Sequence, residues 1–114
     1  MLVRKMEDVQ QDDVDAEGAD GVKIRSLITR DDGAPNVAMR EFELAPGGHT
    51  PFHAHGWEHE VYVLAGRGVV AGEGGEFPLE AGTVVLVPPD EKHNFKNTGS
   101  EVLRFLCVVP HGAA

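Results

Sequence analysis

The amino-acid sequence predicts an all-β domain, built as a sandwich, a jelly roll or a barrel. Apolar residues recur with a period of two over short runs, and turn-forming segments rich in Gly, Pro, Asp and Asn separate these runs. No long segment shows a clean helical period. A chain of 114 residues is the size of one domain. About eight to ten short strands in one small domain are compatible with a sandwich, a jelly roll or a barrel.

The predicted strands follow one another from residue 22 onward. Each is a short run of alternating or continuous apolar residues, rich in the β-branched and aromatic types that strands favour. Segments such as DDGAPN, APGG, GEGG and NTGS fall between the runs and supply turn chemistry. In chain order the predicted strands are VKIRSLIT (22–29), VAMREFEL (37–44), EVYVL (60–64), GVVA (68–71), EFPL (76–79), TVVLV (83–87), HNFKN (93–97) and VLRFLCVV (102–109).

The N-terminal region differs in composition from the rest of the chain. Residues 7–20 carry only acidic charges and little apolar sequence, so we predict an exposed connection there. We therefore expect residues 1–21 to form an N-terminal strand and an acidic connection, within the same domain as a barrel of residues 22–114. The acidic residues of the connection are Glu7, Asp8, Asp12, Asp13, Asp15, Glu17 and Asp20.

The overall composition bounds the partners and the location of the protein. A net charge of -9 argues against nucleic acid as a partner, because affinity for phosphate comes mainly from Lys and Arg. The chain has no apolar run of about 18 residues, and its N-terminus has no signal-peptide core. The single Cys107 cannot form an intrachain disulfide, which fits a reducing compartment. We expect a soluble, cytoplasmic protein with no membrane partner.

Three of the six histidines fall in the segment HAHGWEHEVYVLAG (53–66). His53 and His55 are two residues apart, so on a strand their side chains would leave the same face, about 7 Å apart along the chain. A turn at Gly56 and Trp57 would bring His59 back on the next strand. Imidazole nitrogen is a ligand for Mn, Fe, Ni, Cu or Zn, so the segment predicts one side of a metal site.

The segment GTVVLVPPDEKHNFKN (82–97) supplies a second pattern. Together the two segments resemble the two sequence blocks of the cupin superfamily, and the similarity extends over most of the chain. The resemblance implies the cupin double-stranded β-helix, which is a jelly-roll barrel. The matching residues are His53, His55 and Gly66 in the first block, and Gly82, Pro88, His93 and Asn97 in the second.

Two positions depart from the usual cupin pattern. Counting back from Gly66, His59 stands where most cupins have a Glu ligand, and this resembles a group of small bacterial cupins with four histidine ligands. Glu60, next to His59, stays open as an alternative ligand. Asp90 stands where many cupins have Gly, and Asp tolerates the left-handed turn that this position implies.

By this resemblance we expect one divalent metal ion per chain, bound by His53, His55, His59 and His93. Manganese is the first expectation, and iron, nickel, zinc and copper are alternatives. Four histidines leave two positions open on an octahedral ion, whereas four around a tetrahedral zinc would close the site. The resemblance favours the open site. A neutral ligand in place of Glu leaves the site more positive, which favours anionic co-ligands or substrates.

The resemblance implies a metal-dependent oxidoreductase of dioxygenase type that acts on a small organic substrate. Two alternatives stay open: a non-catalytic module that binds or senses a small molecule, and a metal-dependent isomerase or decarboxylase. Fold alone does not decide among them. Similarity to small cupins also implies a homodimer, in which LVRK (2–5) would add a strand to the exposed sheet edge of a partner.

Four further residues are candidates for the substrate pocket. Arg40 shares a predicted strand face with apolar residues, so it either points inward to grip a carboxylate or lies at an edge; Glu41 falls on the wetter opposite face. Phe105 and Cys107 share a face of the last predicted strand. Cys107 is either an inert core cysteine or a pocket residue beside the metal. Trp57 either packs at the turn or forms a wall of the site.

Overall fold

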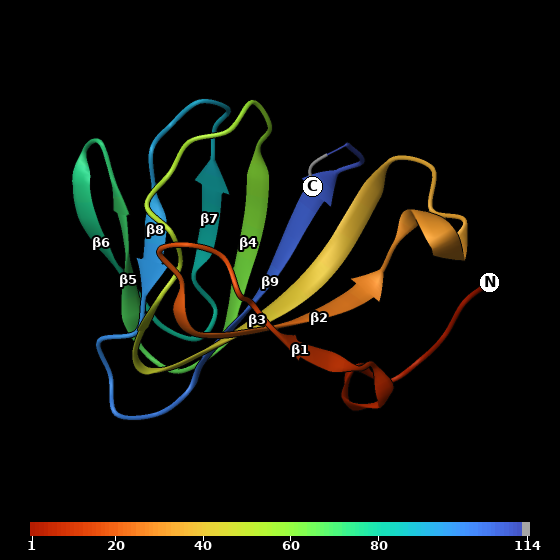
Figure 1. Cartoon of the computed structure of the whole chain (residues 1–114), viewed down its shortest axis with the longest axis horizontal. Coiled ribbons are helices and arrows are strands. Elements are labelled where there is room, and N and C mark those ends of the chain that lie inside the picture. The colour runs from red at the N-terminus through yellow and green to blue at the C-terminus, as the bar shows by residue number, and fades with distance from the viewer. Residues whose placement is uncertain (113–114) are drawn as a thin grey trace.

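Nine strands form one antiparallel sheet that curls into a jelly-roll half-barrel (Figure 1), which confirms the predicted fold class. The computed structural model describes residues 1–112. Within this range the helical segments are two single 3-10 turns, Met6–Asp8 and Arg30–Asp32, and no helix is long and apolar enough to cross a membrane. The strands are β1 (Gln11–Asp13), β2 (Asp20–Ile28), β3 (Val37–His49), β4 (His59–Ala65), β5 (Gly68–Gly72), β6 (Gly75–Leu79), β7 (Val84–Val87), β8 (Asn94–Lys96) and β9 (Leu103–Pro110).

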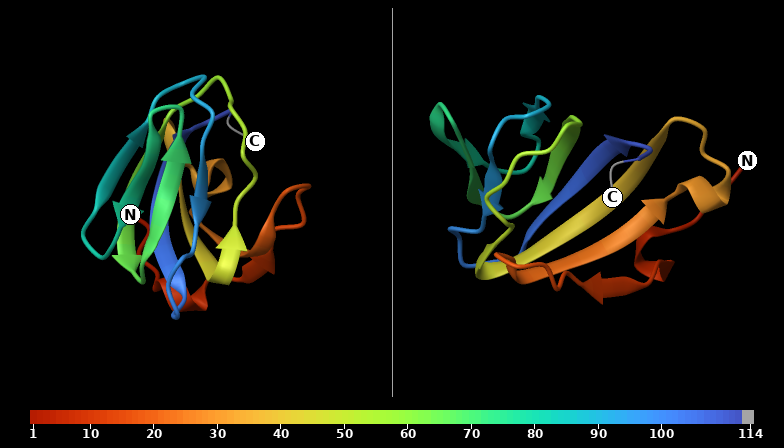
Figure 2. Two further views of the ribbon diagram at one scale, coloured as in Figure 1. Left: turned by 90° about the vertical axis from the view of Figure 1, so that its left-hand side faces the viewer. Right: turned by 45° about the horizontal axis from the view of Figure 1, so that its top comes forward.

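The long strand β3 joins the parts of the sheet. The strand order is β6-β5-β8-β3-β9-β4-β7, with β2 also paired to β3 and β1 paired to β2. The first part of β3 lies between β2 and β9, and its last residue, His49, pairs with Lys96 of β8. As a result, β5 and β6 lie at one end of the molecule and β1 and β2 at the other (Figure 2).

The inner face of the curled sheet is apolar because alternate side chains of each strand point inward. In β9 every second residue from Leu103 to Val109 is buried, and the residues between them are partly exposed. Phe105, at 1% exposure, lies at the centre, and its replacement by Ala would cost about 3–5 kcal/mol of folding free energy. The core consists of Val22, Leu44, Val61, Val63, Val70, Leu79, Val87, Phe95, Leu103, Phe105, Cys107 and Val109.

All eight predicted strands are present, and most end within two residues of their predicted bounds. The exception is β3, which continues through the predicted turn APGG to His49. Residues 45–48 form a bulge there, because Leu44 pairs with Val22 and His49 pairs with Asp20, so that Gly21 alone stands opposite them. A bulge bends the strand, and this one lets β3 turn from β9 toward β8.

His53 and His55 do not lie on a regular strand, so the strand geometry predicted for them is wrong. His53 forms an isolated bridge with His93, in which the two backbones exchange N–H···O bonds of 3.2 and 3.0 Å. Residues 54–58 form a loop that leads to β4. This bridge joins two segments that are far apart in the chain, and it sets the positions of both histidines.

The acidic N-terminal segment is more than an exposed connection. It contains β1, which pairs with β2 at the outer end of the sheet, with Asp12 opposite Ile24. Residues 2–5, which were expected to form a strand on a partner, lie outside regular structure in this chain. The pairing of β1 uses backbone groups, so it tolerates the acidic side chains that predicted a loop.

Glu41 is buried at 0% exposure, which corrects the prediction that it lies on the wetter face. Its carboxylate accepts hydrogen bonds from Arg25 at 3.0 Å and from Arg104 at 3.1 Å. The N-terminal segment covers these arginines: Arg25 also donates to the carbonyl of Val9, and Arg104 contacts the sulfur of Met6. A buried carboxylate needs such partners because desolvation of an unpaired charge is costly.

Two turns that border the predicted blocks have backbone conformations that restrict the residue type. Asp90 has a φ of 70° and is the one non-glycine residue with positive φ among the described residues, as its turn role predicted. Gly66 has a φ of +88°, and a Cβ there would lie 2.4 Å from the carbonyl oxygen of Val102. No other residue type fits at Gly66, because real Cβ atoms do not approach backbone oxygen that closely.

Candidate metal centre

Three histidines from both predicted segments converge inside the half-barrel. One ring nitrogen from each of His53, His55 and His93 lies within 4.8 Å of the others. The backbone bridge between His53 and His93 fixes the positions of these two residues. His55 is held by a hydrogen bond of 2.7 Å that the Asp90 backbone N–H donates to its carbonyl oxygen. These contacts join the two segments, so the cluster depends on the tertiary fold.

His59 lies directly beside this cluster. It is the first residue of β4, it is only 8% exposed, and its Nε2 atom is 2.8 Å from the Nε2 atom of His55. Its ring centroid lies 4.5 Å from that of His55 and 5.3 Å from that of His93. Glu60, the alternative ligand, is exposed on the other face of β4.

Hydrogen bonds to the Nδ1 atoms orient two of the rings. His93 Nδ1 is 2.9 Å from the carbonyl oxygen of Glu91, and His55 Nδ1 is 3.2 Å from that of Trp57. A carbonyl oxygen can only accept, so both Nδ1 atoms carry the hydrogen and both Nε2 atoms keep a free lone pair. Metal-binding histidines commonly show this arrangement.

Burial favours the neutral form of three of these histidines. Desolvation lowers the pKa of His53 and His93, and it lowers the pKa of His59 to about 3, with a further contribution from the nearby His55. Neutral imidazole is the form that binds a metal. Two adjacent ligands on an octahedral ion with bonds of about 2.1 Å are about 3.0 Å apart, which is close to the spacing between His55 and His59. The residues therefore fit a divalent ion.

The histidines line a cavity of about 430 Å³. Its walls are mainly apolar and aromatic. Phe42 and Phe95 both stack on Phe105, with ring centroids 5.5 and 4.7 Å away, and Trp57 stacks on His55 at 4.3 Å. The four predicted pocket residues Arg40, Phe105, Cys107 and Trp57 all line this cavity.

Arg40 and Cys107 meet on one wall of the cavity. The Arg40 guanidinium donates to Cys107 Sγ at 3.5 Å and lies over the Phe42 ring, 5.1 Å from its centroid. Cys107 Sγ is also 2.9 Å from His59 Nδ1. Burial raises the pKa of the Cys107 thiol, so it is protonated at neutral pH. Cys107 thus links the arginine to the histidine cluster.

The sequence did not indicate every residue of the cavity wall. Asp13, Val14 and Ala16 line it from the N-terminal segment, and no periodic signal marks them. Phe42 was identifiable, because it shares a strand face with Arg40. The acidic composition of residues 7–20 hid their position against the barrel.

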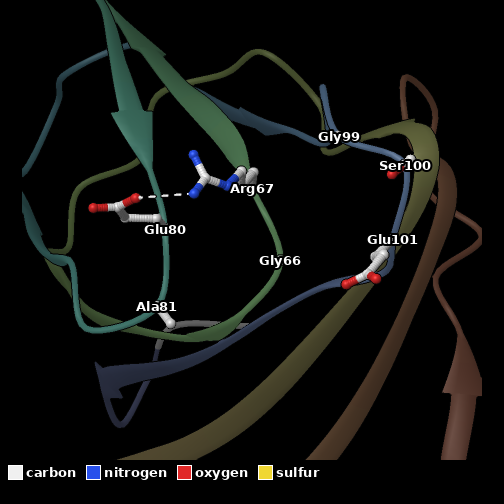
Figure 3. A pocket seen from close by; sticks show the side chains of 7 residues that line it. All are labelled: Gly66, Arg67, Glu80, Ala81, Gly99, Ser100 and Glu101. Carbon is white, nitrogen blue, oxygen red and sulfur yellow. Dashed lines mark ion pairs between the residues drawn. The ribbon is translucent and has the colours of Figure 1, made fainter.

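A second pocket of about 490 Å³ lies at the opposite end of β4 from His59, after the strand ends at Ala65. Arg67 and Glu80 form an ion pair on one side of it, with 3.7 Å between their charged atoms (Figure 3). Both side chains are largely exposed, and the pocket contains no histidine. Surface ion pairs of this kind contribute little stability, and the chemistry of the histidine cluster is absent here.

A curled antiparallel sheet with a histidine cluster inside it defines a β-barrel protein of the kind that commonly binds a metal. The chain belongs to the cupin family: the cupin domain family (Cupin_2) matches residues 40–109. This range includes the three clustered histidines, His59 and the strands β4 to β8.

Relatives of the chain carry out different functions. A structure of the polyketide cyclase RemF from Streptomyces resistomycificus has 36% sequence identity and a TM-score of 0.91, covering 96% of this chain and 79% of that one. Auxin-binding protein 1 of Arabidopsis thaliana is 29% identical over 95% of this chain and 58% of its own length. Glucose-6-phosphate isomerase of Pyrococcus horikoshii is 43% identical over 69% of this chain and 43% of its own length. The chain therefore spans about half the length of these two curated relatives.

Proposed function

We propose that this protein is a metal-dependent enzyme that acts on a small, largely apolar substrate bearing a carbonyl group. The observation that carries the proposal is the position of four imidazoles on the wall of an aromatic cavity of about 430 Å³. A cavity of this size suits a small organic molecule. Similarity to the polyketide cyclase RemF over 96% of the chain supports a ring-closing reaction on a ketone-containing substrate.

The proposed metal ligands are His53, His55, His93 and, as the fourth, His59. A divalent ion held there would polarise a carbonyl oxygen as a Lewis acid. We propose manganese first, with iron, nickel, zinc or copper as alternatives, because nitrogen ligands suit all of them. The Glu91 and Trp57 carbonyls hold His93 and His55 with their lone pairs toward the site. The aromatic walls would exclude water and orient a planar substrate.

Dioxygenase-type oxidation is the second candidate function. The histidines face a cavity on one side, so a bound ion would keep positions that a small molecule can reach. This property favours oxygen chemistry as much as Lewis-acid chemistry. An isomerase and a non-catalytic binding module are further candidates, because two of the relatives carry such names. The experiment below distinguishes the binding module from an enzyme.

The test begins with elemental analysis of protein purified without a metal-affinity column. Protein loaded with each of the five metals is then incubated with poly-β-ketones and aromatic diketones, with and without oxygen, and products are followed by mass spectrometry. Turnover without oxygen supports the cyclase, and turnover with stoichiometric oxygen uptake supports the dioxygenase. Binding without turnover for every metal would overturn the enzyme proposal.

We also propose that the chain forms a homodimer. β7 lies at one end of the strand order, and its Val84 and Leu86 are 70% and 63% exposed, next to the half-exposed Tyr62 of β4. An open strand edge beside exposed apolar side chains is a typical pairing surface. Light scattering should give a mass of two chains, and a single-chain mass at micromolar concentration would contradict the proposal.

A further inference from the structure

The charges that line the cavity do not balance. Arg40 contributes a permanent positive charge to the cavity wall. Asp13 is the one carboxylate in the lining, and it is exposed to solvent. Among residues 1–112, no carboxylate lies within ion-pair distance of Arg40. By contrast, Arg25 and Arg104, on the other face of the sheet, both form ion pairs with Glu41.

Arg40 is also incompletely hydrogen-bonded. Its one hydrogen bond within the described chain is the long contact of 3.5 Å to the Cys107 sulfur, and its buried Nε–H has no partner there. A guanidinium has five N–H donors, and a buried donor without an acceptor costs free energy. The guanidinium carbon lies over the Phe42 ring, 5.1 Å from its centroid, but this ring offers no oxygen or nitrogen acceptor for the N–H groups. The arrangement is the kind that an anionic ligand completes.

A divalent ion on four neutral ligands would add two further positive charges to the same cavity. A site with three uncompensated charges and aromatic walls binds an anion much better than a neutral molecule of the same shape. The stacked rings of Phe42, Phe105 and Phe95 form a continuous apolar surface beside the guanidinium. Such a surface suits the planar body of the anion.

We propose that the cavity selects planar organic acids, with the ligand carboxylate on the Arg40 guanidinium and the ligand ring against Phe42 and Phe105. This inference rests on the proposed function in placing the other end of the ligand at the metal and in the positive charge that the metal would add, whereas the preference of the metal-free protein depends on Arg40. Arg40 is thus a specificity-determining residue for the substrate class. Its fork of donors matches a carboxylate in a bidentate geometry that Lys cannot reproduce.

The experiment uses full-length protein stripped of metal by chelation, so its outcome does not depend on catalysis. Binding of 2-naphthoate, its neutral isostere 2-naphthamide and acetate is measured by titration calorimetry and by NMR shifts near neutral pH. The same titrations are run on Arg40→Met, Arg40→Lys and the control Arg67→Met, which removes an exposed arginine at the other pocket. Circular dichroism and thermal melts confirm that each variant is folded.

Wild-type protein should bind 2-naphthoate on the order of tenfold more tightly than 2-naphthamide, as expected for one charge-assisted hydrogen-bonding pair. This preference should vanish in Arg40→Met, fall in Arg40→Lys and persist in Arg67→Met. Acetate should bind weakly to all, because it lacks the ring. Equal binding of acid and amide by the wild type, or an unchanged preference in Arg40→Met, would overturn the inference and leave the metal-dependent function untouched. If the protein binds no metal but still prefers the acid to the amide, the metal-dependent function is overturned and this inference stands.

Discussion

The Nε2 atoms of His55 and His59 lie 2.8 Å apart, within hydrogen-bonding distance. His55 Nε2 has a free lone pair because its Nδ1–H is directed at the carbonyl of Trp57. Without metal, the contact therefore requires an N–H on His59 Nε2, which leaves His59 Nδ1 to accept from the Cys107 thiol. A bound metal would require the other tautomer, and a thiol can accept as well as donate. Cys107 is thus compatible with both states of His59.

Replacement of His93 by Ala should abolish stoichiometric metal binding and leave a folded barrel. His93 supplies a nitrogen of the three-histidine cluster, and no other described side chain is placed to replace it. Elemental analysis of the purified variant measures the metal content. His49→Ala is the control, because His49 lies outside the cluster. Full occupancy in His93→Ala would show that the metal site lies elsewhere.

His59 and Glu60 should differ sharply in their effect on metal binding. His59 is buried beside His55, whereas Glu60 is exposed on the other face of β4. His59→Gln should lower metal affinity at least about tenfold, the range seen when groups around a metal are removed, and Glu60→Gln should leave it unchanged. Competition titration with a chromogenic chelator measures both affinities. The reverse order would mean that β4 presents its other face to the ion.

Metal should raise the melting temperature substantially. An ion that binds the folded chain and only weakly the unfolded one adds about 4 kcal/mol at a thousandfold excess over its dissociation constant. For a domain of this size that corresponds to roughly 10 to 30 °C. Differential scanning calorimetry of chelated and metal-loaded protein tests this. A difference of a degree or two would contradict a site with four ligands.

The metal-free protein should lose stability as the pH falls from 7 to 5. Burial lowers the pKa of His59 from 6.5 to about 3, so below pH 6.5 the unfolded chain takes up a proton that the folded chain does not. His59 alone then accounts for a loss of roughly 2 kcal/mol at pH 5. Urea denaturation in the presence of chelator measures the free energy of unfolding. His59→Gln should flatten this dependence, and an equal slope in the variant would contradict the assignment.

Replacement of Glu41 by Ala should destabilise the fold by about 2 to 3 kcal/mol, the range for loss of buried hydrogen bonds to charged groups. The substitution removes the bonds of Glu41 to Arg25 and Arg104, while Glu43 still pairs with these arginines at 2.6 and 3.8 Å. Glu76→Ala is the matched control, because Glu76 pairs with Lys96 on the surface and should cost less than about 1 kcal/mol. Urea denaturation of both variants gives the comparison. Similar small effects for both would mean that the Glu41 pairs contribute no more than surface ones.

The strands and the histidines could be read from local sequence. Alternating apolar residues and Gly-rich turns are nearest-neighbour signals, so they predicted all eight strands from Val22 onward. The resemblance to the two cupin blocks implied that histidines of both segments converge, and the structure brings His53, His55 and His93 together. The left-handed backbone conformation of Asp90 was also predictable, because Asp tolerates positive φ in turns. These features depend on backbone preferences that act within a few residues.

Only the tertiary structure decided what surrounds those elements. The orientation of Arg40 depends on which face of β3 the curled sheet encloses. Glu41 lies on the other face of β3, and it is buried because residues about 35 positions earlier, around Met6 and Val9, cover that face. Residues 54–58 are a loop because the bridge between His53 and His93 takes the place of a regular strand. Asp13 reaches the cavity through β1 pairing, which uses backbone groups and leaves no mark in the side chains. Long-range contacts of this kind have no local signature, and so the sequence identified the chemistry of the site and part of its wall, but not the wall that the N-terminal segment supplies.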